Sequence, residues 1–232
     1  MRKFVFILAQ LVFIAGFANA EKRISITGDI AACRLEKALS SIDEHYQKGE
    51  REFVLDLDSV GGDLGAAIEF IERLDRFHGA TFNTQVTGSW SQCSSACFPI
   101  FAAGEKRKAL SGTEFFVHGL SWHRSESLSL LPEEDEFLVD IPWQNEERLV
   151  SLLFGNFFTT KSSCTLGYNR YWLAGDQPNL ALAMEEYLAA VRRSSQKIAE
   201  EITPYIKGSA KRKKTYEPKD LRKIDPEFLM SN

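Results

Sequence analysis

After residue 20 the sequence lacks any apolar run long enough to cross a membrane. A transmembrane helix needs about 20 consecutive apolar residues, and no later segment supplies them. The spacings typical of zinc sites are lacking too, since there is neither a Cys-x-x-Cys nor a His-x-His pair. An excess of basic residues is also absent: the formal net charge is −4, which gives no general attraction to nucleic acid. We therefore predict no metal site, no nucleic-acid partner and no transmembrane segment in the body of the chain.

The N-terminus has the order of features typical of a signal peptide. A basic start at Met1-Arg2-Lys3 precedes an apolar stretch over residues 4–17, and Ala18-Asn19-Ala20 supplies small residues before Glu21. The apolar stretch is shorter than a membrane anchor requires. We expect residues 1–20 to be removed, which takes away two basic residues and moves the net charge to −6. The mature protein is then expected in the periplasm or secreted, with one domain over residues 21–207 and a basic, exposed tail over residues 208–232.

Four cysteines remain after this expected cleavage, and exported proteins usually fold in an oxidising compartment. One or two disulfide bonds are expected. Four cysteines permit three complete pairings, and the sequence does not choose among them. Cys93 and Cys97 are four positions apart, which places them on one face of a helix, so a bond between them or to Cys33 would brace the segment around residue 95. Buried free thiols are the alternative. The four residues are Cys33, Cys93, Cys97 and Cys164.

Alternating strand-like and helix-like segments predict an α/β protein with a mainly parallel sheet. A turn-rich connector is expected over residues 88–94, and the pattern is blurred over residues 120–176 apart from a predicted helix at residues 145–154. Asp63 is expected to cap one helix and Asn179 to begin another. Strands are predicted at residues 23–27, 53–58, 81–86 and 114–117, and helices at residues 31–46, after Asp63, within residues 96–103, and from Pro178-Asn179 to about Ile206.

Three segments between Leu57 and His118 carry the candidate chemistry: LDSVGGDLGAAIEFIERL, CSSACFPIFAAGEKR and FFVHG. Together they resemble the Clp protease proteolytic subunit and its exported relatives in the Clp-protease/crotonase superfamily. In that family a strand ends in Ser-Pro-Gly-Gly, a nucleophilic serine precedes an apolar helix that ends at Ala-Ala-Gly, and a histidine follows on the next strand. The corresponding residues are Ser59-Val60-Gly61-Gly62, Ser95 before Ala102-Ala103-Gly104, and His118.

The resemblance implies a spiral of parallel strands with flanking helices and a long C-terminal helix. It also implies a serine peptidase that acts on a peptide or protein without a cofactor. The residue types suit that chemistry, because a serine hydroxyl needs a nearby base and histidine can take the proton near neutral pH. Acyl transfer further needs N–H donors for the developing oxyanion. Gly61, Gly62 and the N–H of Ala96 are the candidate donors, with Ser95 and His118 as the catalytic pair.

The acid of a catalytic triad is harder to find in this sequence. Compared with the family pattern, lysine at about position 213 stands where the aspartate is expected. Asp135, Asp140 and Asp176 are alternative candidates. Otherwise Ser95 and His118 act as a dyad, or the protein has lost activity.

Two departures from the family pattern bear on function. Val60 replaces the usual proline, and residues 120–176 do not match the family helix that shapes ring assembly. A homo-oligomer is the alternative to a monomer, and these residues do not predict a ring. A catalytically inactive binding or scaffold protein of the cell envelope is the main alternative, and export argues against crotonase-type acyl-CoA chemistry because coenzyme A is a cytoplasmic cofactor.

Overall fold

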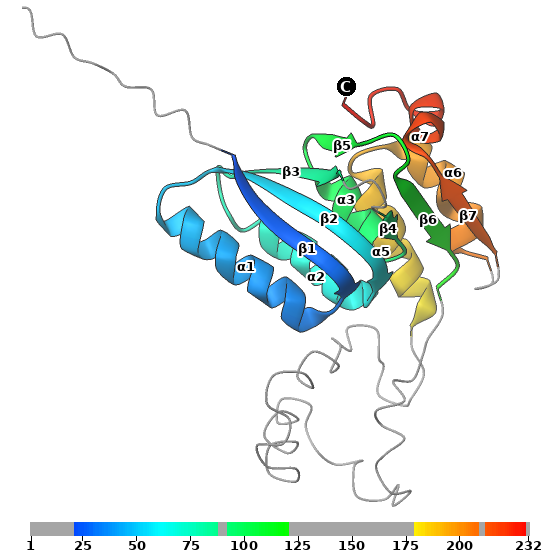
Figure 1. Cartoon of the computed structure of the whole chain (residues 1–232). Helices are drawn as coiled ribbons and strands as arrows, with labels where there is room; N and C mark the ends of the chain where they lie inside the picture. The colour runs from blue at the N-terminus through cyan, green and yellow to red at the C-terminus, as the bar shows by residue number, and fades with distance from the viewer. Residues whose placement is uncertain (1–20, 88–91, 121–178, 209–211, 231–232) are drawn as a thin grey trace, which may run out of the picture.

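Strands and helices alternate along the first half of the chain, as the sequence predicts (Figure 1). The computed structural model describes residues 21–87, 92–120, 179–208 and 212–230. The expected signal peptide and the predicted helix at residues 145–154 lie outside these residues. The strands are β1 (Lys22–Ile30), β2 (Glu52–Gly62), β3 (Thr81–Val86), β4 (Gln92–Ser94), β5 (Arg107–Ala109), β6 (Glu114–His118) and β7 (Lys213–Tyr216). The helices are α1 (Ala32–Gln47), α2 (Leu64–Leu74), α3 (Cys97–Ala103), α5 (Leu180–Arg192), α6 (Gln196–Ile206) and α7 (Pro218–Ile224).

The long strand β2 organises the sheet. It pairs in parallel with β1 from Phe53 to Gly62. On its other edge its first half pairs with β3, and further along Ser59 pairs with Cys93 of β4. The strand order is β5-β3-β2-β4-β6-β7, with β1 also paired to β2, and β6–β7 is the antiparallel pair among these described strands. Parallel neighbours need crossover connections, which α1, α2 and α3 provide. This arrangement brings the ends of β2, β4 and β6 to one part of the sheet.

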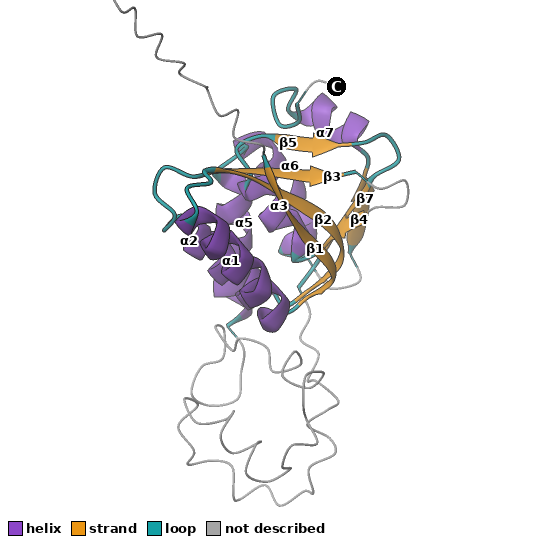
Figure 2. Cartoon of the chain, turned by 60° about the vertical axis from the view of Figure 1, so that its left-hand side comes forward, coloured by secondary structure: helices purple, strands orange, loops and turns teal. Residues whose placement is uncertain are grey.

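The helices bury the apolar faces that the sequence pattern predicts. In α1 the stripe of Leu35, Leu39 and Ile42 is buried, and α1 lies beside α2 (Figure 2). Helix α3 packs against α2, α5 and β2, and six of its seven residues are buried. A helix that is apolar on all sides belongs in a core, so this prediction is confirmed. No helix of the described ranges combines the length and the apolarity that crossing a membrane requires.

The predicted helix starts at Asp63 and Asn179 are confirmed by their capping bonds. The Asp63 carboxylate accepts a hydrogen bond from the Ala66 N–H at 3.1 Å. The Asn179 side chain accepts one from the Leu182 N–H at 3.0 Å. Both side chains satisfy an N–H that has no partner within its own helix.

The single long helix expected up to Ile206 is divided into α5 and α6, which corrects the sequence prediction. Ser195 has an extended backbone with φ −158°, and its hydroxyl accepts a hydrogen bond from the Ile198 N–H at 3.1 Å. The same hydroxyl donates to Asp225 at 2.6 Å. Serine side chains favour helix caps over helix interiors, so this residue starts a new helix.

Two segments expected to be irregular are part of the fold. The connector expected up to Ser94 contains β4, and β2 continues through Gly61 and Gly62. Residues after 208, expected as an exposed basic tail, supply β7 and α7. The prediction of an exposed tail is wrong because it considered only the lysines. Tyr216, Leu221 and Phe228 of this segment are buried.

Candidate active site

Ser95 occupies a strained turn between β4 and α3. Its φ is +51°, and among the described residues it is the one non-glycine residue with positive φ. A left-handed conformation of this kind costs about 1–3 kcal/mol and persists where the surroundings enforce it. Here the Ser95 N–H donates to the Phe116 carbonyl of β6 at 2.8 Å, and the Ser95 carbonyl accepts from the Phe98 N–H at 3.0 Å. The Tyr187 hydroxyl of α5 also donates to that carbonyl, at 3.2 Å. Three elements therefore hold one peptide turn.

Burial separates Ser95 from the neighbouring serine. Ser94 is buried, with 5 % of its surface exposed, whereas Ser95 is partly exposed. A nucleophile has to reach its substrate, and of the two serines Ser95 is the more exposed.

Gly61 lies directly against the Ser95 turn. A Cβ at Gly61 would stand 2.6 Å from both the Ser94 carbonyl oxygen and the Ser95 Cβ, and the φ of Gly61 is +93°. Only glycine fits such a position. The Gly61 N–H donates to the buried Ser59 hydroxyl at 3.0 Å. Gly62 has no room for a Cβ either, because it packs on the Ile30 carbonyl. At the end of β2, therefore, backbone without side chains lies against the Ser95 turn.

A disulfide bond between Cys93 and Cys97 spans the Ser95 turn, with Cα atoms 5.2 Å apart. It joins the strand before the serine to the first residue of α3, and both cysteines are fully buried. The sequence left the pairing open, and this pair is the one that braces the turn. Cys33 is disulfide-bonded as well, and Cys164 lies outside the described residues.

His118 ends β6 on the same side of the strand as Phe116, with ring centroids 5.6 Å apart. Because the Phe116 carbonyl binds the Ser95 N–H, His118 lies two residues along the strand from the serine turn. The ring atom Nδ1 is 2.8 Å from the Gly119 carbonyl oxygen. A carbonyl can only accept, so this contact favours the proton on Nδ1 and leaves Nε2 with a lone pair. Nε2 is then the atom able to act as a base.

No described hydrogen bond joins the Ser95 hydroxyl to His118, and no described acidic side chain bonds to the imidazole. Catalytic hydrogen bonds are often long before substrate binds. Opposite His118 in the antiparallel pair stands Lys213, whose Nζ is 5.7 Å from the Phe116 ring centroid. The structure therefore puts lysine beside the histidine, as the sequence comparison suggested. Asp135, Asp140 and Asp176 lie outside the described residues.

Ala96 follows Ser95 and caps α3 with helical backbone angles. In the part of the chain that the structure describes, its N–H makes no hydrogen bond, although the residue is only 1 % exposed. A buried N–H usually has a partner. No acceptor for this amide is described, so it stays a candidate donor for a negative oxygen beside Ser95.

Sequence reasoning missed Tyr187 and the Gly119 carbonyl. Tyr187 stands 92 positions from Ser95 in a helix that the motif does not include. Its apolar neighbours in α5 predict a core position and nothing more. The Gly119 contact depends on the local path of the chain after β6, for which the residue types give no signal.

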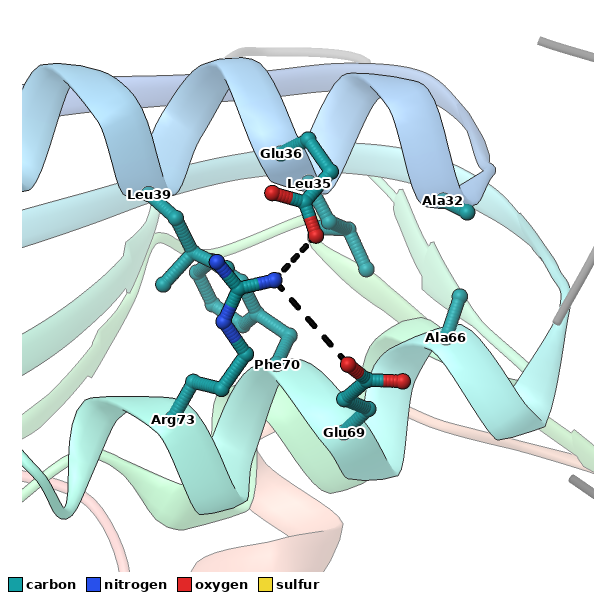
Figure 3. Close-up of a pocket in the computed structure, with 8 residues that line it drawn as sticks. All are labelled: Ala32, Leu35, Glu36, Leu39, Ala66, Glu69, Phe70 and Arg73. Carbon is teal, nitrogen blue, oxygen red and sulfur yellow. Dashed lines mark hydrogen bonds and ion pairs between the residues drawn. The ribbon is translucent and has the colours of Figure 1, made fainter. Parts of the chain in front are cut away.

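A shallow pocket lies away from these residues, between α1 and α2 (Figure 3). Arg73 pairs with Glu36 across it and with Glu69 at 3.9 Å. Arg73, whose charge is compensated by these two carboxylates, bridges the two helices. None of the candidate site residues lines the pocket. It is lined by Ala32, Leu35, Glu36, Leu39, Ala66, Glu69, Phe70 and Arg73.

No protein-family model matches this sequence, and no curated protein matches it. Solved structures do resemble it. A serine-to-alanine mutant of the 1510-N membrane-bound stomatin-specific protease has 12 % sequence identity and a TM-score of 0.53, over 91 % of this chain and 81 % of that one. A lysine-to-alanine mutant of that protease, in complex with a substrate peptide, has 13 % identity and a TM-score of 0.56, over 92 % and 75 %. The chain has the Clp-protease/crotonase-like α/β fold.

Proposed function

We propose that this chain is a serine peptidase in which Ser95 is the nucleophile and His118 is the general base. The observation that carries the proposal is the Ser95 turn: a serine at φ +51°, tied to the strand of His118 and packed against Gly61. Strain of this kind is concentrated at functional sites. A serine that served only to cap α3 would not need it.

In the proposed reaction the Ser95 oxygen attacks the carbonyl carbon of a peptide bond, and its proton passes to His118 Nε2. The carbonyl oxygen becomes negative and is stabilised by N–H donors. Ala96 supplies the first of these, and Gly61 or Gly62 the second; Gly61 would share or exchange its bond to Ser59. His118 then gives the proton to the leaving amine. Water, deprotonated by the same imidazole, then attacks the acyl-serine, and His118 returns the proton to the Ser95 oxygen as the carboxylic acid leaves.

Among the described residues the proposed pair has no carboxylate partner. In serine proteases the triad acid orients the imidazole and stabilises its charged form, and its loss reduces turnover by roughly 10⁴-fold. Here the Gly119 carbonyl accepts from Nδ1 and can supply the orientation. It supplies no full negative charge, so we expect a slow enzyme.

Peptides are the proposed substrate class. The similar protease structure is described in complex with a substrate peptide, and the exposed Gly62 at the end of β2 offers backbone without a side chain to an extended peptide. We further propose that the protein works outside the cytoplasm. The buried disulfide beside the nucleophile supports this, because such bonds persist in oxidising compartments.

The decisive experiment is covalent labelling of the purified, oxidised protein with a fluorophosphonate probe, followed by mass-spectrometric mapping of the adduct. We expect labelling at Ser95, its loss in Ser95→Ala, and a fall of at least about 100-fold in His118→Ala. Ser94→Ala is the matched control, because it removes the adjacent hydroxyl and should keep the label. Folded protein that stays unlabelled would overturn the proposal and favour a non-catalytic binding protein.

A further inference from the structure

The planar peptide unit between Ser95 and Ala96 carries two hydrogen-bonding groups, the Ser95 C=O and the Ala96 N–H. The peptide bond is planar and trans, so its C=O and N–H point in opposite directions. Whatever fixes the Ser95 carbonyl therefore also fixes the direction of the Ala96 N–H. That N–H is the proposed first donor to the oxyanion, so the bonds on the Ser95 carbonyl decide where the donor points.

Two donors hold this carbonyl. One is the Phe98 N–H, at 3.0 Å. It belongs to α3 and moves with the turn itself. The other is the Tyr187 hydroxyl, at 3.2 Å, which comes from α5. Tyr187 therefore ties the peptide plane to a separate element of the core.

The surroundings of Tyr187 make its hydroxyl a permanent donor. The side chain is fully buried, and burial, together with the nearby Tyr216, raises the pKa of Tyr187 far above its usual value. The phenol stays protonated at every pH at which the protein would work. Phenylalanine would fill almost the same space, and burying a hydroxyl is unfavourable unless it is hydrogen-bonded. The bond to the Ser95 carbonyl is thus what the hydroxyl contributes here.

We propose that Tyr187 is a positioning residue of the oxyanion site. By donating to the Ser95 carbonyl it aims the Ala96 N–H at the position of the oxyanion. It also strengthens that N–H as a donor, because hydrogen bonds arranged in series polarise one another. This inference rests on the proposed function and deepens it: α5 belongs to the catalytic apparatus although it carries no reacting group.

The test is the rate at which a fluorophosphonate inactivates the full, oxidised protein, measured over a range of probe concentrations. In Tyr187→Phe we expect the maximal rate constant kinact to fall about fivefold to tenfold, the effect of one hydrogen bond, with little change in the half-saturating concentration KI. A role in packing alone would change the midpoint of thermal unfolding and leave kinact at the wild-type value. 3-Fluorotyrosine in place of Tyr187, a stronger donor of similar size, should keep kinact at or above wild type even if the phenylalanine variant folds poorly.

Two control variants remove a comparable bond elsewhere. Tyr216→Phe deletes the hydroxyl of another buried tyrosine, whose partner is Glu201 at 3.1 Å. Tyr46→Phe deletes another bond from a phenol to a carbonyl, that of His78 at 2.9 Å. Both should leave kinact unchanged. A wild-type rate in Tyr187→Phe, with the wild type itself labelled at Ser95, would overturn this inference alone. An unlabelled wild type would overturn the proposed function and this inference with it.

Discussion

The two halves of the candidate site are held in very different ways. On the nucleophile side, Ser95 is bound through its own backbone to β6, α3 and α5, and a disulfide bond spans its turn. On the base side, His118 ends a strand, the one described hydrogen bond of its side chain goes to the next residue, and its neighbour across the sheet is an exposed lysine. The contacts that restrict movement are therefore concentrated at the serine turn, where a strained backbone has to be maintained. The described contacts of the imidazole are fewer: the Gly119 carbonyl oxygen and the Phe116 ring.

The largest expected effect comes from filling the space beside the serine. Gly61→Ala would place a methyl group against the Ser94 carbonyl and the Ser95 Cβ, and it would also strain a backbone at φ +93°. We expect a loss of about 2–4 kcal/mol in the free energy of unfolding and a fall of at least about 100-fold in labelling. Urea unfolding and probe kinetics measure the two effects.

The variant Gly112→Ala separates the effect of the steric clash with the Ser95 turn from the effect of the strained backbone. Gly112 has a similar φ of +88°, and nothing lies within 4 Å of a Cβ built there. Its variant should lose only the smaller, conformational part of the stability and keep wild-type labelling. Equal losses in both variants would show that contact with the Ser95 turn has no special importance.

The disulfide comes next in expected size. The double variant Cys93→Ala, Cys97→Ala removes a bond that closes a loop of only a few residues, so we expect a loss of about 2 kcal/mol in unfolding free energy. Labelling should fall with it, because the turn then depends on hydrogen bonds alone. Both are measured under oxidising conditions, so the bond at Cys33 stays intact in wild type and variant alike. Unchanged labelling would mean that those hydrogen bonds are enough to hold Ser95 in place.

The site was predictable to the extent that it follows from the order of parallel strands. Gly61 and Ser95 come at the ends of β2 and β4, and parallel neighbours end on the same side of a sheet, so motif order alone brought them together. Tyr187 could not be found in this way, because its contact crosses 92 positions and depends on how α5 packs. The disulfide pairing could not be predicted either, because four cysteines permit three complete pairings and the sequence does not choose among them.

The errors in the fold come from local preferences that tertiary contacts override. Lysines at residues 213 and 214 suggested a solvated tail, but successive residues of a strand face opposite sides, so the strand that exposes Lys213 also buries Tyr216. The break before α6 depends on Ser195, whose hydroxyl bonds Asp225 of the distant C-terminal segment. A helical pattern that continues across this serine in the sequence cannot reveal such a partner.

The smallest effect is expected on the base side, where Glu201 of α6 holds β7 beside β6. Its carboxylate accepts from Lys214 at 2.8 Å and from Tyr216 at 3.1 Å. The hydrogen bond from Lys214, and then that from Tyr216, lowers the pKa of Glu201 although burial opposes the shift. Both charged side chains are more than a third exposed, so solvent screens the pair. Glu201→Gln should therefore cost only about 0.5 kcal/mol at pH 7 and change labelling less than about twofold.

The pH dependence of that loss identifies its electrostatic origin. A lowered carboxyl pKa contributes stability that is present above the pKa of the unfolded chain, about 4.3, and is lost as the pH falls through the folded value. The difference between wild type and Glu201→Gln should thus be constant from pH 7 to about pH 5 and vanish in more acidic solution. Salt at 1 M should reduce it as well. A difference that persists under both conditions would show that packing, rather than charge, holds β7 in place, and the base side would then be more rigid than its hydrogen bonds indicate.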